Sequence, residues 1–410
     1  MGLNDTPRAE RTHIAFFGKR NAGKSSLLNA AAGQDIAIVS EQKGTTTDPV
    51  YKSMELLPLG PVVLIDTPGI DDEGALGALR IQKTRQVLNK ADAAVLVAEA
   101  GTALGPAETA LITLFKERGI NYCIAFNKSD LISTPPPPTS IDSGGPVIFV
   151  SAKNGDNITL LKETIARLGK SEDPKLRLVG DLVRPGDFVI LVTPIDKAAP
   201  KGRLILPQQQ VIRDLLEADA AAIVVKEYEL RETLAQLGKK PALVVTDSQV
   251  FAKVSADVPR DIPLTSFSIL FARYKGVLEA AVAGAAALDS LAAGDRILIC
   301  EGCTHHRQCD DIGTVKLPRW IKNYCGAAPR FAFCSGGDFP EELSAYRLIV
   351  HCGACMLNER EMRRRLRQAA AEHIPMTNYG IVIAHTQGIL KRSVAMFPHI
   401  YAQLENSTPQ

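Results

Sequence analysis

Cysteine and histidine side chains gather in the last third of this 410-residue chain. Seven of its eight cysteines lie between residues 300 and 355, and the stretches GCTHHRQCDD at 302–311 and VHCGACMLN at 350–358 add three histidines. Thiolate sulfur and imidazole nitrogen are the ligands that zinc and iron–sulfur centres take from proteins. Because the polar start MGLNDTPRAERTH predicts no secretion signal, metal binding is favoured over disulfide formation.

Each of the two stretches follows an apolar run that predicts a β-strand. The carboxyl ends of neighbouring strands meet at one edge of an α/β sheet, so adjacent strands would bring the two stretches together. Zinc and iron–sulfur centres use similar ligand spacings, and these residues alone do not decide between them. The predicted metal ligands are Cys303, His305, His351, Cys352 and Cys355.

Neighbouring residues leave two alternatives open. Cys300 makes a second CxxC with Cys303, so it is an alternative fourth thiolate. The basic run RRRLR at 363–367 is interpreted either as a docking site for an anionic cofactor or an acidic partner, or as a solvated helix face. The remaining thiols of this region are expected to be free: Cys309, Cys325 and Cys334.

A different chemistry is predicted near the amino terminus, where GKRNAGKS at 18–25 fits the pattern GxxxxGK[ST]. An apolar strand pattern precedes this loop and a helix pattern follows it. Glycines let backbone N–H groups curl around phosphate oxygens, Lys24 reaches the β- and γ-phosphates, and Ser25 supplies an oxygen to magnesium. The helix start adds its positive dipole end. The predicted phosphate-binding residues are Gly18, Asn21, Gly23, Lys24, Ser25 and Ser26.

Further segments predict magnesium and guanine recognition. VVLIDTPGI at 62–70 places Asp66 near magnesium and the Gly69 N–H near the γ-phosphate. In NKSD at 127–130, the Asp130 carboxylate can accept hydrogen bonds from the N1–H and N2–H₂ edge of guanine, which adenine lacks. In GTTTDP at 44–49, Thr46 is the expected magnesium-binding threonine, with Thr47 as the alternative. The predicted guanine-binding residues are Asn127, Lys128, Asp130, Ser151, Ala152 and Lys153, and the predicted catalytic residues are Lys24, Thr46 and Gly69.

These motifs, in this order, resemble the translation-factor-related GTPases across roughly residues 10–170. Ile70 stands where Ras-like proteins carry a water-orienting glutamine, so intrinsic hydrolysis is expected to be slow. Asn21 is similar to the asparagine of potassium-activated GTPases such as the tRNA-modification GTPases, in which a monovalent cation replaces an arginine finger. The alternative is that Asn21 only shapes the loop.

The middle of the chain alternates strand and helix patterns after the charged stretch GKSEDPKLR at 169–177, and it carries no catalytic motif. A small α/β domain with an open sheet edge can pair with its twin, so dimerisation is the expected role. The predicted fold class is α/β, with a P-loop GTPase domain followed by two smaller α/β domains.

CxH at 303–305 and HCxxC at 351–355, downstream of a GTPase domain, resemble the FeFe-hydrogenase maturation GTPases over essentially the whole chain. The resemblance implies a GTPase domain (1–172), a dimerisation domain (173–262) and an iron–sulfur cluster domain (263–410). It also implies a 4Fe–4S cluster on Cys303, Cys352 and Cys355, with a fourth position taken by His305 or His351 or left exchangeable. Such a site would carry a di-iron precursor with CO and cyanide to apo-FeFe-hydrogenase, alongside radical-SAM maturation enzymes.

Composition limits the other function classes. The formal charge of +2 and the absence of a basic, aromatic-studded strand predict no nucleic-acid partner. Apolar runs are too short for a membrane span, so a cytoplasmic protein is expected. The middle domain and the family resemblance make a homodimer the expected assembly. The alternative function is a zinc-containing regulatory GTPase acting on RNA or ribosomes. A radical enzyme would need a CxxxCxxC loop, which the chain lacks.

Overall fold

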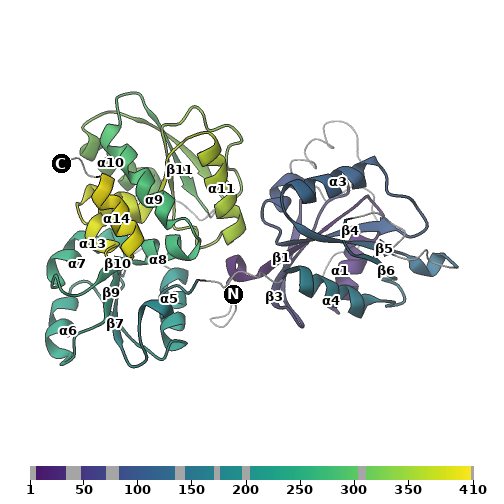
Figure 1. Ribbon diagram of the computed structural model, residues 1–410, viewed down its shortest axis with the longest axis horizontal. Coiled ribbons are helices and arrows are strands. Elements are labelled where there is room, and N and C mark those ends of the chain that lie inside the picture. The colour runs from purple at the N-terminus through teal and green to yellow at the C-terminus, as the bar shows by residue number, and fades with distance from the viewer. Residues whose placement is uncertain are drawn as a thin grey trace. The chain divides into compact units, whose positions relative to one another are not determined.

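The computed structural model describes residues 6–33, 48–70, 83–133, 144–169, 176–195, 204–302 and 311–407. The chain divides into two compact units, Met1–Pro174 and Lys175–Gln410, and Figure 1 draws their helices and strands. The predicted α/β class is confirmed in both units. Within the described ranges, no helix is long and apolar enough to cross a membrane.

The first unit is built on a six-stranded sheet of order β2-β3-β1-β4-β5-β6. β2 pairs antiparallel with β3, and the other pairs are parallel, so β1, β3, β4 and β5 end at the same edge of the sheet. The strands are β1 (Thr12–Phe17), β2 (Val50–Leu56), β3 (Gly60–Asp66), β4 (Ala93–Glu99), β5 (Asn121–Asn127) and β6 (Val147–Phe149).

Helices cover both faces of this sheet because its strands are apolar on both sides. Ile14 and Phe16 of β1 belong to the core that also contains residues of α1 (Lys24–Ala32) and α4 (Ile158–Gly169). The alternate residues of β1, Ala15 and Phe17, belong to the core that contains residues of α3 (Pro106–Glu117). The strand period of two therefore distributes each apolar run between two helix layers.

The second unit contains two four-stranded sheets, both parallel throughout, of order β10-β9-β7-β8 and β12-β11-β13-β14. The first sheet consists of β7 (Phe188–Val192), β8 (Ala221–Val225), β9 (Leu243–Thr246) and β10 (Leu264–Ser266). The second consists of β11 (Arg296–Glu301), β12 (Arg330–Ser335), β13 (Leu348–His351) and β14 (Met376–Asn378).

One hydrophobic core joins these two sheets, since it contains both Val189 of β7 and Ile349 of β13. The helices of this unit are α5 (Leu206–Leu216), α6 (Leu230–Gln236), α7 (Phe251–Asp257), α8 (Phe267–Tyr274), α9 (Leu278–Ala285), α10 (Leu317–Cys325), α11 (Glu359–Ala371), α12 (Tyr379–Thr386), α13 (Leu390–Ser393) and α14 (Pro398–Ser407). Helix α9 lies so close to β14 that a Cβ atom on Gly284 would stand 2.4 Å from the Met376 carbonyl oxygen. The division of this unit at residue 262 stays a prediction.

Candidate functional site

The predicted phosphate loop runs from the end of β1 to the start of α1, and its glycines are required by close approach of other backbone and side-chain atoms. A Cβ atom on Gly18 would lie 2.1 Å from the Val97 carbonyl oxygen, and one on Gly23 would lie 2.2 Å from Asn127 Nδ2. Gly23 and Asn21 have positive φ angles of 85° and 61°, in the left-handed region that glycine and asparagine tolerate best. The sequence of this loop therefore fits a tight curve of backbone N–H groups around an anion.

Lysine and hydroxyl groups inside this curve are positioned for phosphate and magnesium. Lys24 is buried, and its Nζ donates to the carbonyl oxygens of Gly18 at 3.0 Å and Lys19 at 2.7 Å. The Ser25 hydroxyl donates to Asp66 Oδ2 at the end of β3, and burial raises the pKa of Asp66. Among the described residues, the buried Asp66 Oδ1 has no hydrogen-bond partner. Hydroxyl and carboxylate oxygens that converge in this way fit Mg²⁺.

Asn127 at the end of β5 links the phosphate loop to the predicted guanine-binding segments. Its Nδ2 donates to the Ala22 carbonyl oxygen at 3.1 Å, and its Oδ1 accepts from the Ala152 backbone N–H at 3.1 Å. The Ser151 hydroxyl donates to Asp130 Oδ1 at 2.7 Å, which lowers the pKa of this exposed carboxyl. Asp130 is therefore ionised at neutral pH and can accept two hydrogen bonds from a guanine edge.

These segments line an open pocket of about 780 Å³, a size suited to a small-molecule ligand. The structure brings most of the predicted guanine-binding residues together with residues of the phosphate loop. The pocket lining includes Gly23, Ser26, Asn127, Lys128, Asp130, Ala152 and Lys153.

The γ-phosphate end of this site is described only in part. Thr46 and Thr47 lie outside the described residues. Gly69 stands three residues after the end of β3, and the partly buried Ile70 side chain packs against the core beneath α3. A side chain held in an apolar core has no atom that could orient a water molecule, which agrees with the expectation of slow hydrolysis.

The predicted cysteine site lies at the carboxyl ends of β11 and β13. The expectation that the two strands are neighbours is confirmed, because they pair in parallel from Ile297↔Leu348 to Cys300↔His351. Immediately beyond this pair, Cys352 Sγ accepts the backbone N–H groups of Gly302 at 3.0 Å and Ala354 at 3.4 Å. Backbone donors aimed at a sulfur atom are the environment that thiolate ligands of iron–sulfur clusters use.

The other predicted thiolate ligands differ in how far the structure describes them. Cys355 is partly buried, and burial raises its pKa while the charge of Lys275 partly offsets that effect. Cys303 and His305 lie outside the described residues, which begin again at Asp311. The structure therefore shows one side of the predicted cluster site, formed by the CxxC turn.

His351 is fixed by two contacts rather than left open to a ligand. It is 1% exposed, its Nδ1 lies 2.9 Å from the Cys352 carbonyl oxygen, and its Nε2 lies 2.9 Å from Arg365 Nη1. A guanidinium only donates, so Nε2 accepts and Nδ1 carries the proton. Burial, followed by the charge of Arg365, lowers the pKa of His351 to about 3. In this neutral form the ring has no free lone pair, and a metal would have to displace Arg365.

Arg365 is the site residue that sequence reasoning missed. It is fully buried, donating from Nε to Glu361 Oε1 at 2.8 Å and from Nη2 to the Gly336 carbonyl oxygen at 2.7 Å. Both interpretations of RRRLR at 363–367, a docking site or a solvated helix face, are wrong for this residue. The sequence did contain one sign of this ion pair, because Glu361 stands four residues earlier, on the same face of the helix.

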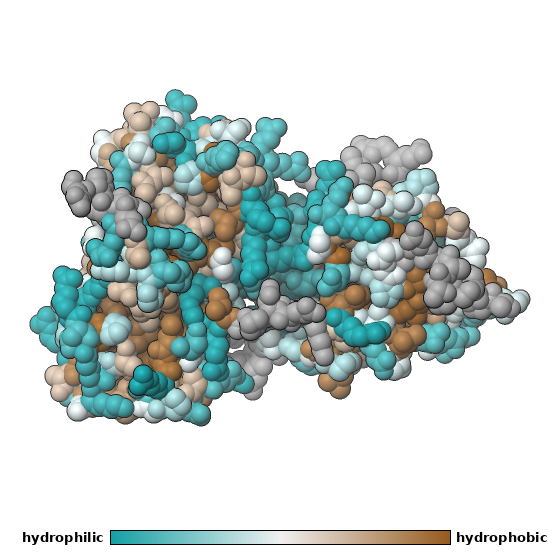
Figure 2. All heavy atoms as spheres, in the orientation of Figure 1, coloured by the Kyte–Doolittle hydropathy of each residue, from teal (hydrophilic) through white to brown (hydrophobic). Residues whose placement is uncertain are grey.

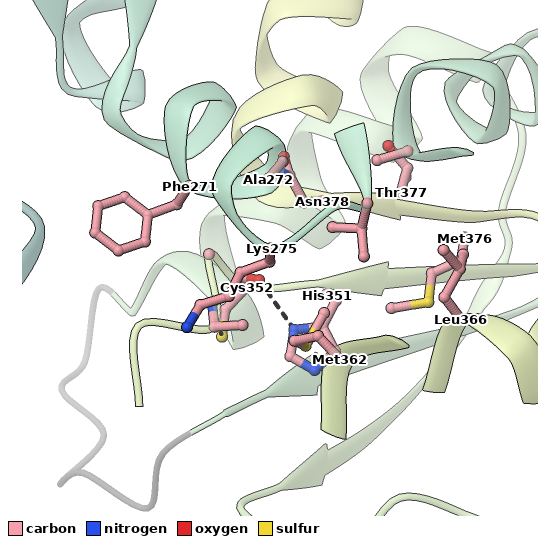
Figure 3. A pocket seen from close by; sticks show the side chains of 14 residues that line it. Phe271, Ala272, Lys275, His351, Cys352, Met362, Leu366, Met376, Thr377 and Asn378 are labelled. Carbon is pink, nitrogen blue, oxygen red and sulfur yellow. Dashed lines mark hydrogen bonds between the residues drawn. The ribbon is translucent and has the colours of Figure 1, made fainter. Parts of the chain in front are cut away.

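Lys275 is a second residue that the sequence did not single out. Figure 3 shows it reaching from the end of α8 toward Cys352, beside a narrow cavity whose other walls include Phe271 and Met362. Its side chain is 3% exposed. The cysteine turn therefore has a buried positive charge on the α8 side, in addition to the charge of Arg365 beneath His351.

The sheet order, the phosphate loop and the guanine-binding segments define a P-loop GTPase domain in the first unit. Residues 13–128 match the family described as "50S ribosome-binding GTPase". Residues 178–276 match the "Hydrogen maturase F dimerization domain", and residues 279–396 match the "Hydrogen maturase F tetramerization domain". The chain belongs to the hydrogen maturase F family, which confirms the resemblance found in the sequence.

Curated relatives resemble the first unit. The tRNA modification GTPase MnmE of Nitrosospira multiformis is 33% identical over 157 residues, which are 38% of this chain and 34% of the relative. MnmE of Nitrosomonas europaea is 33% identical over 159 residues, 38% of this chain and 35% of the relative. The chain thus spans about a third of the length of these relatives.

Two solved structures with low TM-scores are also similar to this chain. Aquifex aeolicus Era bound to GDP·AlF₄⁻ is 21% identical with a TM-score of 0.35, over 55% of this chain and 98% of that chain. The G domain of T. maritima FeoB is 23% identical with a TM-score of 0.30, over 39% of this chain and 100% of that chain.

The buried Arg365 gives a prediction about stability. Arg365→Met should lower the free energy of unfolding of the second unit by about 3–5 kcal/mol, because it leaves the buried His351 and Glu361 short of a partner. Urea unfolding followed through Trp320, the one tryptophan of the chain, would measure this loss. Arg363→Met on the same helix is the matched control, since the Arg363 side chain is 51% exposed and should contribute about 0.5 kcal/mol or less. Equal losses in both variants would contradict a structural role for the buried contact.

Proposed function

We propose that this chain is a GTP-hydrolysing carrier that holds a 4Fe–4S cluster together with a di-iron precursor bearing CO and cyanide. It would deliver that precursor to apo-FeFe-hydrogenase in the cytoplasm. The observation that carries the proposal is the convergence of the β11 and β13 ends, where Cys352 Sγ accepts two backbone N–H groups beside the strand that leads to Cys303. Membership of the hydrogen maturase F family supports the hydrogenase as the recipient.

The nucleotide would be bound by the residues of the first unit in their predicted roles. Lys24 and the start of α1 stabilise the charge of the β- and γ-phosphates, and Ser25 with Asp66 holds Mg²⁺. Thr46 and the Gly69 N–H would close around the γ-phosphate. Asp130 selects guanine, while Asn127 keeps the guanine-binding segments in register with the phosphate loop.

Potassium is proposed as the cation that replaces an arginine finger in this site. Asn21 supports it, because the residue lies in the predicted phosphate loop with a φ of 61° and its exposed side chain would be available to a cation beside the phosphates. Likeness to tRNA modification GTPases supports the same assignment. Ile70 offers no group to orient water, so the cation would compensate for only part of a slow reaction.

The cluster would be bound by Cys303, Cys352 and Cys355, and it would supply an iron with an exchangeable fourth ligand. His351 supports this assignment indirectly, since both of its nitrogens are engaged and its Nδ1–H fixes the Cys352 carbonyl. Cys300 points to Cys334 instead of the CxxC turn. We therefore propose that the fourth position is left to His305 or to an external ligand, with Lys275 as a fixed positive charge nearby.

Self-association is proposed through the second unit, as a homodimer at least. The edge strand β8 leaves Ala221, Ala222, Ile223 and Val225 only partly buried and Val224 42% exposed, although all five are apolar. Figure 2 shows hydrophobic residues, in brown, among hydrophilic ones on the visible surface of the second unit. A second copy of the chain would cover this edge by strand pairing. Radical-SAM maturation enzymes are the proposed source of the precursor.

The cluster assignment predicts a metal analysis. Protein purified without oxygen should contain about four irons and four sulfides per chain. Its EPR signal after dithionite reduction should change when imidazole or cyanide is added, because an exchangeable iron binds them. Cys352→Ser should lose most of the iron, whereas Cys123→Ser, a control buried in the first unit, should keep it. One zinc per chain and a silent spectrum after iron–sulfide reconstitution would refute the assignment.

The proposed separation of GTP hydrolysis from cluster binding predicts how a phosphate-loop variant behaves. Lys24→Ala should reduce GTP turnover by about 100-fold or more, because the developing phosphate charge loses its cation. Iron content should stay at the wild-type level, since the residues proposed to bind the cluster lie in the other unit. Phosphate release and iron analysis on the same preparation would test both. A parallel loss of iron would show that the two chemistries are not separate.

The cation assignment predicts a difference between salts. GTP turnover should be at least about tenfold faster in potassium chloride than in sodium chloride, a difference of about 1.4 kcal/mol in the barrier. Asn21→Gly should abolish this difference, because glycine tolerates the positive φ but provides no side-chain oxygen. Unchanged potassium stimulation in the variant would assign Asn21 a role in loop shape alone.

A further inference from the structure

Two thiols outside the proposed cluster ligands face each other across neighbouring strands of the second sheet. Cys300 of β11 is the registered partner of Cys334 of β12, with parallel pairing along both strands. Their Sγ atoms lie 3.1 Å apart, which is closer than the van der Waals contact of two sulfur atoms. The nearby Cys325 has a different environment, since its Sγ lies 3.8 Å from two backbone carbonyl oxygens.

The two sulfurs differ in access to solvent. Cys300 is completely buried, whereas Cys334 is partly exposed on β12, which forms the edge of the sheet. An exposed thiol next to a buried one is the arrangement in which the first attacks an external sulfur and the second resolves the product.

We infer that Cys300 and Cys334 form a redox-active dithiol that is oxidised to an intramolecular disulfide by small disulfides of the glutathione class. Adjacent strands hold paired Cα atoms about 4.8 Å apart, within the range of about 4.4–6.8 Å that disulfides span. No movement of one strand past the other is needed to form the bond.

The reaction balances as two thiol–disulfide exchanges. The Cys334 thiolate attacks one sulfur of the small disulfide, forming a mixed disulfide and releasing one thiolate. The Cys300 thiol gives up its proton and attacks the Cys334 sulfur, which releases the second thiolate. The protein loses two electrons and two protons, and the small disulfide is reduced to two thiols.

The disulfide is reversible because Cys334 is partly exposed at the edge of the sheet, where a small thiol can attack its sulfur. An excess of the small thiol therefore returns the pair to its reduced form.

The Cys300–Cys334 pair lies next to the proposed cluster site, but the inference does not require a bound cluster. β11 ends one residue after Cys300, and Gly302 separates that end from Cys303. The Cys300 carbonyl oxygen also accepts the Cys352 backbone N–H at 2.8 Å. A change in the bonding of Cys300 thus acts on the backbone beneath both halves of the cysteine site.

Peptide mass spectrometry on the full chain would test the inference. The protein is incubated with oxidised and reduced glutathione in varying ratio, free thiols are blocked with iodoacetamide, and peptides are mapped without reduction. In mostly oxidised glutathione, a peptide pair linked through Cys300 and Cys334 should account for most of both residues. A tenfold excess of reduced glutathione should return most of both residues to the blocked form. Wild-type protein in which both thiols stay free throughout would overturn the inference.

Cysteine variants and the metal content of the protein distinguish a redox-active dithiol from a pair of cluster ligands. Cys300→Ser should retain a stable glutathione adduct on Cys334, whereas Cys334→Ser should slow the reaction of Cys300 by about 100-fold or more, since a buried thiol is attacked slowly. Cys325→Ser is the matched control and should form the linked pair as wild type does. If iron-loaded protein protects both thiols and a chelator releases them, they are cluster ligands, and the inference is wrong whatever the cluster carries.

Discussion

Parallel pairing of β11 with β13 is the constraint on which the cysteine site depends. The register Cys300↔His351 sets the two strand ends level, so the backbone of Gly302 meets the sulfur of Cys352 with no intervening loop. A slip of one residue would turn the side chains of β13 to the opposite face of the sheet. His351 would then lose Arg365, and the CxxC turn would lose the hydrogen bond from Gly302. The geometry of the cysteine site therefore depends on strand register before it depends on any ligand.

In the first unit, a side chain instead of strand register holds the parts of the site together. Asn127 connects the phosphate loop to the segment that carries Ala152, so the recognition of phosphate and base depends on one amide group. Both sites thus lie at a sheet edge where parallel strands end, so strand ends from distant parts of the sequence converge there. They differ in electrostatics, because the nucleotide site is open to water while the cysteine turn is surrounded by the buried charges of Lys275 and Arg365.

Sequence reasoning predicted the elements whose signals are local. The phosphate loop, the strand ending at Asp66 and the strands that precede the two cysteine stretches are each contained in a short run of residues. The burial of Arg365 was not predictable in this way, because charged residues are almost always solvated and two of its partners, His351 and Gly336, lie outside its own helix. Lys275 comes from a helix far earlier in the chain. The contact of Cys300 with Cys334 needs the strand order β12-β11-β13, which no local pattern specifies.

The shared core of the second unit has a consequence for how the chain can be divided into fragments. Val189 and Ile349 belong to the same apolar interior, and α9 is locked against β14 at Gly284. The segments matching the two family descriptions, 178–276 and 279–396, therefore meet across a packed interior instead of a flexible linker. A fragment that begins near residue 279 would expose that interior to water and remove Lys275 from beside the cysteines. The proposed cluster site therefore draws on both segments, since Lys275 belongs to the first and Cys352 to the second.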